Sequence, residues 1–499
     1  MLKEKDAQAS FHDMLWDILL PKDHELVRIK KQFNFSWMDK DLKNYYSDSI
    51  QGRPPFNPVT VFLMLFLEIY DNLSDHEVEE KTSYNALYRY FVGLSLEDPV
   101  PDYSTLSVFR SRLGEEGFKK IFNRFVEELK KQNLVSHNLK IVDATHTEAN
   151  ARVRSRVGII RQAQKRIVAS MEKEDKLKTE DLIGSLHKTK ENTYKKEEGK
   201  KEDIKLLDEE MEKLKELLAL AKGKYLKSAK EKAEEIEDLL FNSQEPLTSL
   251  TDPDARIGHK SKEKSFNGYK IHTVTNESEI TTTVETIPGN TNEGGDLPRL
   301  LKEEEKRDLH GRLALADGLY ASANNRKEIR SQALQMIEVI PADDRKVQAE
   351  NFTYDTQNNA LTCSNGKRAQ GPSPHPEGKL FYFSKMDCME CPLKDPCPSF
   401  SAREGRARVL ISLDRELRLT HPLSPQEQKA IFKSRTIVER TYGKAKKWHG
   451  LSRTRYRGRW RVAIQAFLTF FVLNAKKALR ILEGNCPLKP PGLVALGYG

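Results

Sequence analysis

Three acidic residues of this 499-residue chain stand in contexts that suit metal-dependent chemistry. Asp143 follows the apolar run of NLKIVDATHTEA, and Asp317 follows the run in RLALAD. Glu439 lies in IFKSRTIVERTYGKAKKW, between Arg435 and Lys446. Carboxylate oxygens suit Mg²⁺ or Mn²⁺, and two such ions can activate a water or hydroxyl and stabilise a leaving oxygen. The set predicts a two-metal site for phosphodiester hydrolysis and transfer.

Two strands and a helix are expected to position these carboxylates. The runs before the two aspartates are typical of buried strands that end at the acid, and ligands bind where strands end in open α/β sheets. A long helix is expected from near Gln426, with Arg435, Glu439, Tyr442 and Lys446 on one face. Taken singly, each acid also fits a turn, a cap or a local ion pair. Their order and spacing favour the metal site.

The segments between the acids predict an α/β sheet of mixed direction. FNGYKIHTVTN (266–276) and EITTTVETIPGN (279–290) are β-rich runs separated by a polar turn, which indicates a hairpin. The next expected elements are a helix at 297–308, a strand at 312–317, a helix at 323–334 and a strand at 336–342. Strands that alternate with helices in this way are typical of an α/β fold.

Residues 11–134 predict a wholly helical N-terminal region. Within it, PDYSTLSVFRSRLG offers Asp102 or Ser104 as an N-cap before a run that is expected to expose Arg110 and Arg112. A small helix-turn-helix that contacts DNA would have this pattern. An ordinary helical bundle with solvated arginines is the alternative.

Residues 155–245 differ in composition from their surroundings. Lys, Glu, Leu and Ala recur there with heptad-like spacing, as in IKLLDEEMEKLKELLALAK, which predicts a long helical hairpin or coiled coil. A solvated arm without chemistry is the favoured interpretation. An arm that pairs subunits or lies along DNA is the alternative.

Composition limits the classes of protein that fit. The formal net charge of +9 favours a polyanionic partner, nucleic acid before an acidic membrane surface. The segment MLKEKDAQAS has no apolar stretch, so no signal peptide is expected. The longest apolar run, Val462 to Ala475, is too short and too polar to cross a membrane and is expected to be a buried helix. The expected location is the cytoplasm, on the nucleoid when bound to DNA.

A strongly basic strip surrounds Glu439. Between Lys433 and Arg461 there are eleven Lys or Arg residues and a single acid, with Tyr442, Trp448, Tyr456 and Trp460 interleaved. Basic residues would neutralise phosphates, and aromatic rings would stack on unpaired bases. A merely soluble basic face is the alternative. The DNA-contacting residues expected in the strip are Arg435, Lys446, Lys447, Arg453, Arg455 and Arg457.

Four of the five cysteines gather in one Pro-rich, β-poor stretch, within residues 345–425. They are Cys363, Cys388, Cys391 and Cys397. The stretch is expected to lack apolar residues for its own core, and a structural Zn²⁺ held by four thiolates would supply folding energy. Reduced, partly buried cysteines are the alternative.

At this point the chain resembles a known family, the DDE insertion-sequence transposases with a ribonuclease-H-like core. The family's helix signature is Tyr, two residues, Arg, three residues, Glu, six residues, Lys, and it falls here on Phe432, Arg435, Glu439 and Lys446. Phe432 departs from the signature. The resemblance implies that Asp143, in IVDATHTEA, and the aspartate of LADGLYAS complete the triad. GRPPFNPVTVFLMLFLE also resembles the family's N-terminal domain.

The resemblance implies an enzyme that cuts transposon ends and joins them to target DNA, with Mg²⁺ or Mn²⁺ as cofactor. The expected partners are double-stranded DNA, as terminal inverted repeats and target, and a second copy in a homodimer. Two weaker site candidates are His146, expected to be a hydrogen-bonded neighbour, and the DPDAR segment with Asp254 and Arg256. A nuclease that cuts without joining and a DNA-binding protein without catalysis are the alternative functions.

These expectations give a domain plan. A helical DNA-binding domain at 11–134 precedes a ribonuclease-H-like catalytic domain at 138–480. The helical arm at 155–245 and the cysteine-bearing segment at 345–425 interrupt the catalytic domain, and residues 481–499 form a tail.

Overall fold

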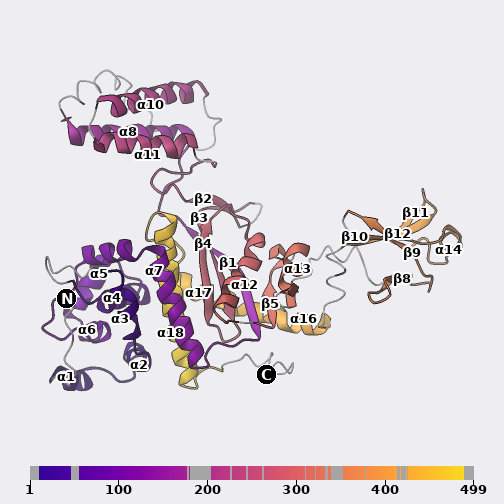
Figure 1. Ribbon diagram of the computed structural model, residues 1–499, viewed down its shortest axis with the longest axis horizontal. Helices are drawn as coiled ribbons and strands as arrows, with labels where there is room; N and C mark the ends of the chain where they lie inside the picture. The colour runs from indigo at the N-terminus through magenta and orange to yellow at the C-terminus, as the bar shows by residue number, and fades with distance from the viewer. Residues whose placement is uncertain are drawn as a thin grey trace.

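A computed structural model places the chain in a central body with two lobes (Figure 1). The structure describes residues 11–46, 55–176, 179, 204–224, 227–242, 245–260, 263–309, 311–320, 322–331, 335–338, 352–376, 378–412, 416, 423 and 425–487. One lobe, above the body in Figure 1, is helical, and the other, at its right, is made of short strands. The expected strand at 336–342 and the expected tail at 481–499 lie partly outside the described residues.

The N-terminal part of the body is helical throughout its described residues, as predicted. Its helices are α1 (Phe11–Leu19), α2 (Glu25–Gln32), α3 (Trp37–Lys43), α4 (Pro58–Tyr70), α5 (Asp75–Tyr84), α6 (Ala86–Val92) and α7 (Tyr103–Lys131). Polar caps start them: the Asn57 side chain accepts the Val59 N–H, and the Asp102 side chain accepts the Thr105 N–H. Asp102, rather than Ser104, is therefore the N-cap of α7.

The C-terminal helix α18 (Arg459–Leu482) lies inside the body against these helices (Figure 1). Among the described residues it is the helix long and apolar enough to cross a membrane, but most of its apolar stretch is buried within the protein. It packs on α7, α4, α2 and a sheet strand. The predicted buried helix at Val462 to Ala475 is confirmed, and one cluster of buried side chains runs from the N-terminal helices through α18 to the sheet.

A six-stranded sheet of mixed direction forms the centre of the body, as predicted. Its strands are β1 (Leu139–Glu148), β2 (Arg256–His259), β3 (Ser265–Asn276), β4 (Thr281–Pro288), β5 (Leu313–Ala316) and β6 (Gln335–Glu338). The order is β2-β3-β1-β5-β6, with β4 also paired to β3. β1 runs antiparallel to β3 and parallel to β5, and the β3–β4 hairpin is confirmed.

The two faces of the sheet have different covers because side chains alternate along each strand. Val142 of β1 and Ala316 of β5 belong to a cluster with α12 (Leu297–Lys306) and α13 (Ala323–Ser331). Ile141 and Leu315 point the other way, into the cluster that contains α17 (Thr436–Trp448) and α18. Residues two positions beyond Ile141 and Leu315 therefore face α17.

In its described residues, the helical lobe contains three packed helices, α8 (Arg156–Glu174), α10 (Ile204–Lys224) and α11 (Lys227–Glu237). Each contacts the other two, and their apolar side chains form a separate buried cluster that includes Ile167, Leu214 and Ala233. The sequence predicted a long helical hairpin or coiled coil. The described part of the region instead forms a shared core to which α8, α10 and α11 all contribute, because α11 also turns an apolar face toward α8 and α10.

The second lobe is richer in strands than the sequence predicted. It contains β7 (Phe352–Asp355), β8 (Ala360–Cys363), β9 (Gln370–His375), β10 (Gly378–Tyr382), β11 (Phe400–Ser401) and β12 (Arg406–Ser412), with the short helix α14 (Lys385–Met389). Phe381, Phe383, Val409 and Ile411 belong to its own buried cluster. The expectation of a β-poor stretch without a core is wrong, since few but well-alternated apolar residues suffice to cover a small sheet.

Candidate active site

Asp143 and Asp317 lie side by side on the sheet face that α17 covers. Parallel pairing sets Ile141 of β1 opposite Leu315 of β5. Two residues further along each strand direction come Asp143 and Asp317, on the same face as Ile141 and Leu315. The register of these two strands therefore brings the two aspartates together, as the sequence predicted.

Asp143 lies within its strand rather than at the strand's end, which corrects the sequence prediction. β1 continues to Glu148 because β3 pairs with it along its whole length, from Lys140 opposite Asn276 to Glu148 opposite Gly268. Only the shorter neighbour β5 ends at the acid, since Asp317 directly follows Ala316. The carboxylate of Asp317 accepts the Leu319 N–H at 2.8 Å and so starts a 3-10 turn.

The helix that carries Glu439 is fastened to β1 by Tyr442. The phenol donates to the backbone carbonyl of Asp143 at 2.7 Å and lies 2.7 Å from Thr273 Oγ1, on the strand opposite. Burial raises the pKa of Tyr442 well above its usual value, so the hydroxyl keeps its proton. Tyr442 is therefore an anchor, not a ring available for stacking on DNA as the sequence suggested.

The expected single long helix is divided in two just before Glu439. α16 (Pro425–Phe432) is followed by a 3-10 turn, Lys433–Arg435, and then by α17. Arg435 thus sits at the junction, one residue before α17 begins, while Glu439 lies in its first turn. Sequence periodicity did not reveal the break because a 3-10 turn continues the chain in nearly the same helical sense.

One guanidinium contacts all three carboxylates. Arg435 Nη2 lies 3.5 Å from Asp143 Oδ2 and 3.6 Å from Asp317 Oδ2, and Arg435 Nε lies 3.9 Å from Glu439 Oε1. Both aspartate oxygens lie near the same nitrogen atom, Arg435 Nη2. The distance between the two oxygens therefore cannot exceed the sum of the first two distances. Three acids that are 122 or more residues apart along the chain therefore converge on one centre.

Exposure of the three acids increases across the site. The side chain of Asp143 is 12% exposed, that of Asp317 24% and that of Glu439 60%. Burial raises the pKa of Asp143 to about 6, although the charge of Arg435 opposes the rise. Asp143 thus lies in a poorly solvated spot where added positive charge would be stabilising.

A fourth carboxylate near the centre escaped the sequence analysis. The charge of Glu293 adds to the rise in the pKa of Asp143, and Glu293 is held by Lys270 at 2.7 Å and by the Tyr320 hydroxyl at 3.3 Å. Glu293 begins a short 3-10 turn before α12. Nothing in the local pattern NTNEGGD marks it, since only the fold brings that turn beside β1.

Lys446 of α17 lies beside His146 of β1, three residues along the chain from Asp143. Its Nζ is 3.4 Å from His146 Nε2, and no ion pair joins it to a carboxylate of the described residues. Burial and the charge of Lys260 lower the pKa of Lys446 to about 8. Burial and the two lysines lower the pKa of His146 to about 4, so this ring is neutral at pH 7. The arrangement leaves a half-buried positive charge that an anion would stabilise.

Comparison with known protein families decides what kind of protein carries this centre. Residues 15–112 match the Transposase domain (DUF772), and residues 243–475 match the Transposase DDE domain. The chain belongs to the DDE transposases. The second match includes Asp317 and Glu439, while Asp143 precedes it and is joined to the site by the strand pairing of β1. No curated protein and no solved structure matches the transposase.

The cations of the transposase's basic strip are either exposed or partly buried. Lys447, Arg453 and Arg457 are exposed. The Arg453 guanidinium donates to the Asn150 side chain at 3.2 Å, and residues 452–454 pair with the end of β1 at Glu148. Arg453 and Arg457 thus lie at the end of β1, where the Arg457 guanidinium also donates to the Asn150 carbonyl at 3.4 Å. Arg112, in α7, is also exposed and stacks over the Tyr46 ring at 4.4 Å.

Two arginines expected to contact DNA are instead paired with an acid that is itself buried, Glu68. Arg110 is 6% exposed and pairs with Asp75 and with Glu68, at 3.3 Å from the latter. Arg455 pairs with the same Glu68 at 3.2 Å. The expectation that Arg110 is exposed is wrong, because the periodicity of α7 does not reveal the buried acid in α4 that attracts it. The Tyr456 hydroxyl also donates to Glu68, at 2.7 Å, so this ring too is unavailable for stacking.

The DPDAR segment of the transposase, a weaker site candidate from the sequence, caps the start of α18. The Asp254 carboxylate accepts the Arg459 N–H at 2.8 Å, and the Asp252 carboxylate accepts the Gly458 N–H at 3.0 Å. Gly458 has a φ of +87°, which suits glycine at this sharp entry to the helix. Arg256 is paired with Glu245 at 2.9 Å. These residues therefore position α18 against the sheet.

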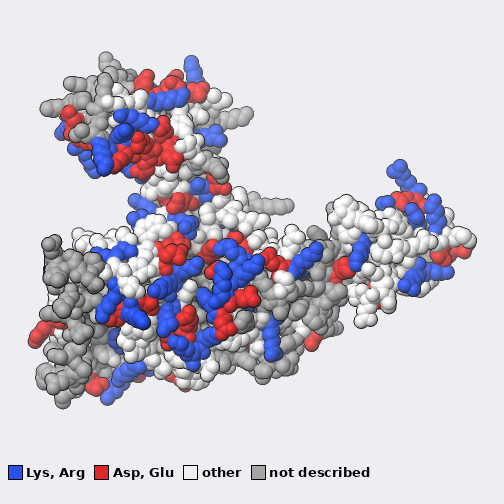
Figure 2. All heavy atoms as spheres, viewed as in Figure 1, with Lys and Arg blue, Asp and Glu red and all other residues white. Residues whose placement is uncertain are grey.

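The face of the transposase drawn in Figure 2 has basic and acidic side chains interspersed over α7 and α12. Many of the charges on these elements are paired, as Arg299 is with Glu285 at 2.6 Å and Lys306 with Glu303 at 2.7 Å. Such an even mixture gives little net attraction for a polyanion.

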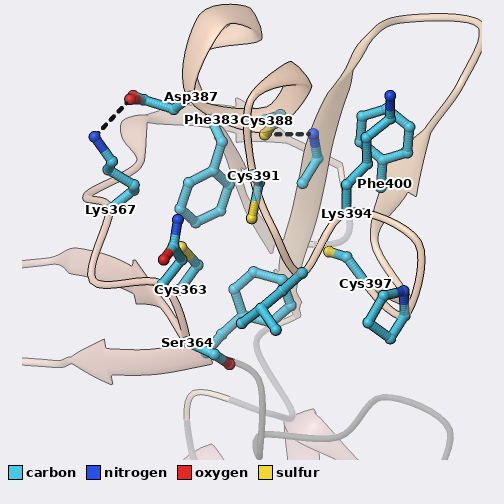
Figure 3. A pocket seen from close by; sticks show the side chains of 15 residues that line it. Cys363, Ser364, Lys367, Phe383, Asp387, Cys388, Cys391, Lys394, Cys397 and Phe400 are labelled. Atoms are coloured by element: carbon cyan, nitrogen blue, oxygen red, sulfur yellow. Dashed lines mark hydrogen bonds and ion pairs between the residues drawn. The ribbon is translucent and has the colours of Figure 1, made fainter.

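The four clustered cysteines line one hollow in the strand-rich lobe (Figure 3). The hollow measures about 110 Å³, and its other lining includes the rings of Phe352, Phe383 and Phe400. Cys363 comes from β8, Cys388 from α14, and Cys391 and Cys397 from the loop after it. None of these four cysteines forms a disulfide bond, and Cys388 Sγ accepts the Ala407 N–H at 3.4 Å. Burial raises the pKa of the Cys388 thiol.

Proposed function

We propose that Asp143, Asp317 and Glu439 hold the divalent ions, two Mg²⁺ or Mn²⁺, with which this transposase cuts transposon ends and joins them to target DNA. The observation that carries the proposal is the contact of all three carboxylates with one guanidinium. The three carboxylates come from two strands and a helix, and their negative charges repel one another when they are brought together. Binding of metal ions explains why the fold nevertheless brings them together.

The donor set fits such ions by chemistry and by charge. All three side chains supply hard oxygen ligands, and the poorly solvated Asp143 gains from added positive charge. As the side chains lie, no group of three His, Cys, Asp or Glu among the described residues is arranged to hold an ion. The reason we infer is that the Arg435 guanidinium lies between the three carboxylates.

The chain's own residues would orient DNA for the reaction. Bound ions would activate the attacking water or 3′-hydroxyl and stabilise the leaving oxygen. Lys446 would bind a phosphate beside the site, and neutral His146 would accept a hydrogen bond from its ammonium group. Tyr442 and Thr273 would hold β1 and α17 at fixed separation, so that the carboxylates keep their positions.

Separate amide variants of the three acids test this assignment. Purified Asp143→Asn, Asp317→Asn and Glu439→Gln are each expected to lower the rate of end joining by on the order of a thousandfold in Mg²⁺, because each loses a metal ligand. Glu148→Gln is the control, since Glu148 is an exposed acid on the same strand. Joining is scored as transfer of a labelled 3′-hydroxyl end into plasmid. Wild-type activity in any of the three variants would reject its role, and cutting without joining would favour a nuclease.

Double-stranded DNA is proposed to lie along the exposed cations next to the carboxylates. Arg453 and Arg457 lie at the end of β1, and Lys447 is an exposed cation that directly follows Lys446 in the chain. Inverted repeats at the element's ends and a target duplex are the proposed substrates, and a homodimer is proposed to bring two ends together. Light scattering with and without end DNA would measure the number of copies in the complex.

We also propose that the catalytic domain is ribonuclease-H-like and that residues 155–245 and 345–425 are insertions in it. The mixed sheet with helices on both faces supports this assignment. The two segments supply lobes with cores of their own, apart from the sheet that carries the aspartates. Deletion of residues 156–242 with a short linker is expected to leave a folded protein, as circular dichroism and a cooperative melt would show. An unfolded product would contradict the insertion.

A structural Zn²⁺ is proposed for the four cysteines. Their thiols surround one hollow and come from separate segments of a small lobe, where a cross-link would stabilise the fold. As they lie, the sulfurs do not form a closed coordination group among the described residues. The proposal therefore rests on four thiols around one hollow, and metal content is its direct test.

A further inference from the structure

The centre of the carboxylate site is occupied by a side chain of the protein itself. Arg435 brings one positive charge within 4 Å of three acids, by the distances of 3.5, 3.6 and 3.9 Å given above. When the acids are ionised, a single guanidinium does not neutralise them. The centre therefore holds its acids together with one cation while keeping an attraction for more positive charge.

The guanidinium is held loosely in this position. All three contacts are longer than the 2.7–2.9 Å typical of charge-assisted hydrogen bonds between arginine and carboxylate. The side chain is 25% exposed, and it starts from the 3-10 turn that separates α16 from α17. A long, partly solvated side chain with weak contacts can turn toward solvent at small cost.

We propose that Arg435 is an internal cation that competes with divalent metal ions for Asp143, Asp317 and Glu439. In the metal-free protein it neutralises part of the carboxylate charge, and it leaves the centre when ions bind. Once displaced, its planar guanidinium is available to a DNA phosphate nearby. This inference rests on the proposed function, because it takes the three carboxylates as the metal ligands. Arg435 acts here as a positioning residue and not as a ligand.

Metal binding by the full chain in the absence of DNA tests the competition. Isothermal titration with MnCl₂ would compare the wild type with Arg435→Gln and Arg440→Gln. Arg440 is exposed on α17, next to Glu439, and each change removes one positive charge from the same part of the chain. Arg435→Gln is expected to bind Mn²⁺ at least about tenfold more tightly than Arg440→Gln, because only Arg435 occupies the centre.

Thermal unfolding gives a second measurement that does not depend on activity. Without metal, Arg435→Gln leaves three acids without their cation, so its Tm is expected to fall below that of Arg440→Gln. Saturating Mn²⁺ is expected to raise the Tm of Arg435→Gln more than that of the wild type. Arg435→Lys, which keeps the charge but has no planar fork, is expected to bind Mn²⁺ with intermediate affinity. It also tests the competition if the Gln variant does not fold.

Each outcome separates this inference from the proposed function. The competition would be overturned if Arg435→Gln bound Mn²⁺ no more tightly than Arg440→Gln. It would also be overturned if Arg435→Lys bound Mn²⁺ no more tightly than the wild type. Asp143→Asn is included in the same titration and is expected to lose Mn²⁺ binding. Unchanged binding in Asp143→Asn would reject the metal site and the competition together. Loss in Asp143→Asn without tightening in Arg435→Gln would reject the competition alone.

Discussion

The hydroxyl of Tyr442 donates a hydrogen bond to the backbone carbonyl of Asp143 across 2.7 Å. This contact joins the helix that carries Glu439 to the strand that carries the first aspartate. The same hydroxyl is 2.7 Å from Thr273 Oγ1, on the neighbouring strand. One phenol thus sets the spacing between two of the proposed metal ligands, from a position where water does not reach it.

Removing that hydroxyl is expected to loosen the site without removing a ligand. Tyr442→Phe would leave the buried Thr273 hydroxyl without this partner and lower the free energy of unfolding by about 1–2 kcal/mol. End joining in Mg²⁺ is expected to slow as α17 shifts on β1. Urea unfolding and the joining assay measure the two effects. Tyr84→Phe, at a ring that is 69% exposed, is the matched control. A Tyr442→Phe protein as stable and active as the control would contradict the anchor.

Much of the sheet was predictable because its cues are local. The β3–β4 hairpin follows from two alternating runs around a polar turn, and α18 follows from its apolar run. Asp102 was one of two caps offered for α7, and the structure selects it. Such features depend on neighbours within a few residues, so a single sequence contains the information.

The remaining features depend on partners far along the chain. The periodicity of α7 placed Arg110 on a solvent face, whereas Glu68, 42 residues earlier, draws it inward. Asp143 was expected at a strand end, whereas pairing with β3 extends β1 to Glu148. Glu293 had no local signal at all. The environment of each of these side chains can be predicted only when its neighbours in the folded structure are known.

The ionic network around Glu68 predicts a dependence of stability on pH. Burial raises the pKa of Glu68 from 4.5 to about 7, against the opposing charge of Arg110. Between these values the folded protein keeps a proton that the unfolded chain has released. The free energy of unfolding therefore falls as pH rises from about 5 to about 8, by on the order of 1–3 kcal/mol from this group.

Glutamine at this position isolates the contribution of Glu68 from other titrating groups. Urea unfolding at pH 5 and pH 8 is expected to show a smaller loss of stability in Glu68→Gln than in the wild type. Glu80→Gln is the control, because Glu80 is exposed on the adjacent helix α5. Identical pH slopes for all three proteins would show that Glu68 titrates normally in the fold.

Zinc content decides the role of the clustered cysteines. Protein purified without chelator is expected to contain one zinc per chain, and Cys391→Ala is expected to lose it and to unfold the strand-rich lobe at lower temperature. Cys486→Ala is the control, since Cys486 lies after α18, away from the hollow. Metal analysis and limited proteolysis of the lobe are the measurements. A metal-free wild type with four titratable thiols would rule out zinc.

Arg455 and Arg457 are two residues apart but are expected to fail in different ways. Arg457 is exposed, so Arg457→Gln is expected to weaken DNA binding and to lower the slope of log affinity against log salt by about one, with stability unchanged. Arg455 pairs with buried Glu68, so Arg455→Gln is expected to cost about 3 kcal/mol of unfolding free energy. Fluorescence anisotropy with duplex DNA at several salt concentrations and urea unfolding separate the two effects. If Arg455→Gln were instead stable but bound DNA weakly, Arg455 would be a DNA-contacting residue and not a structural one.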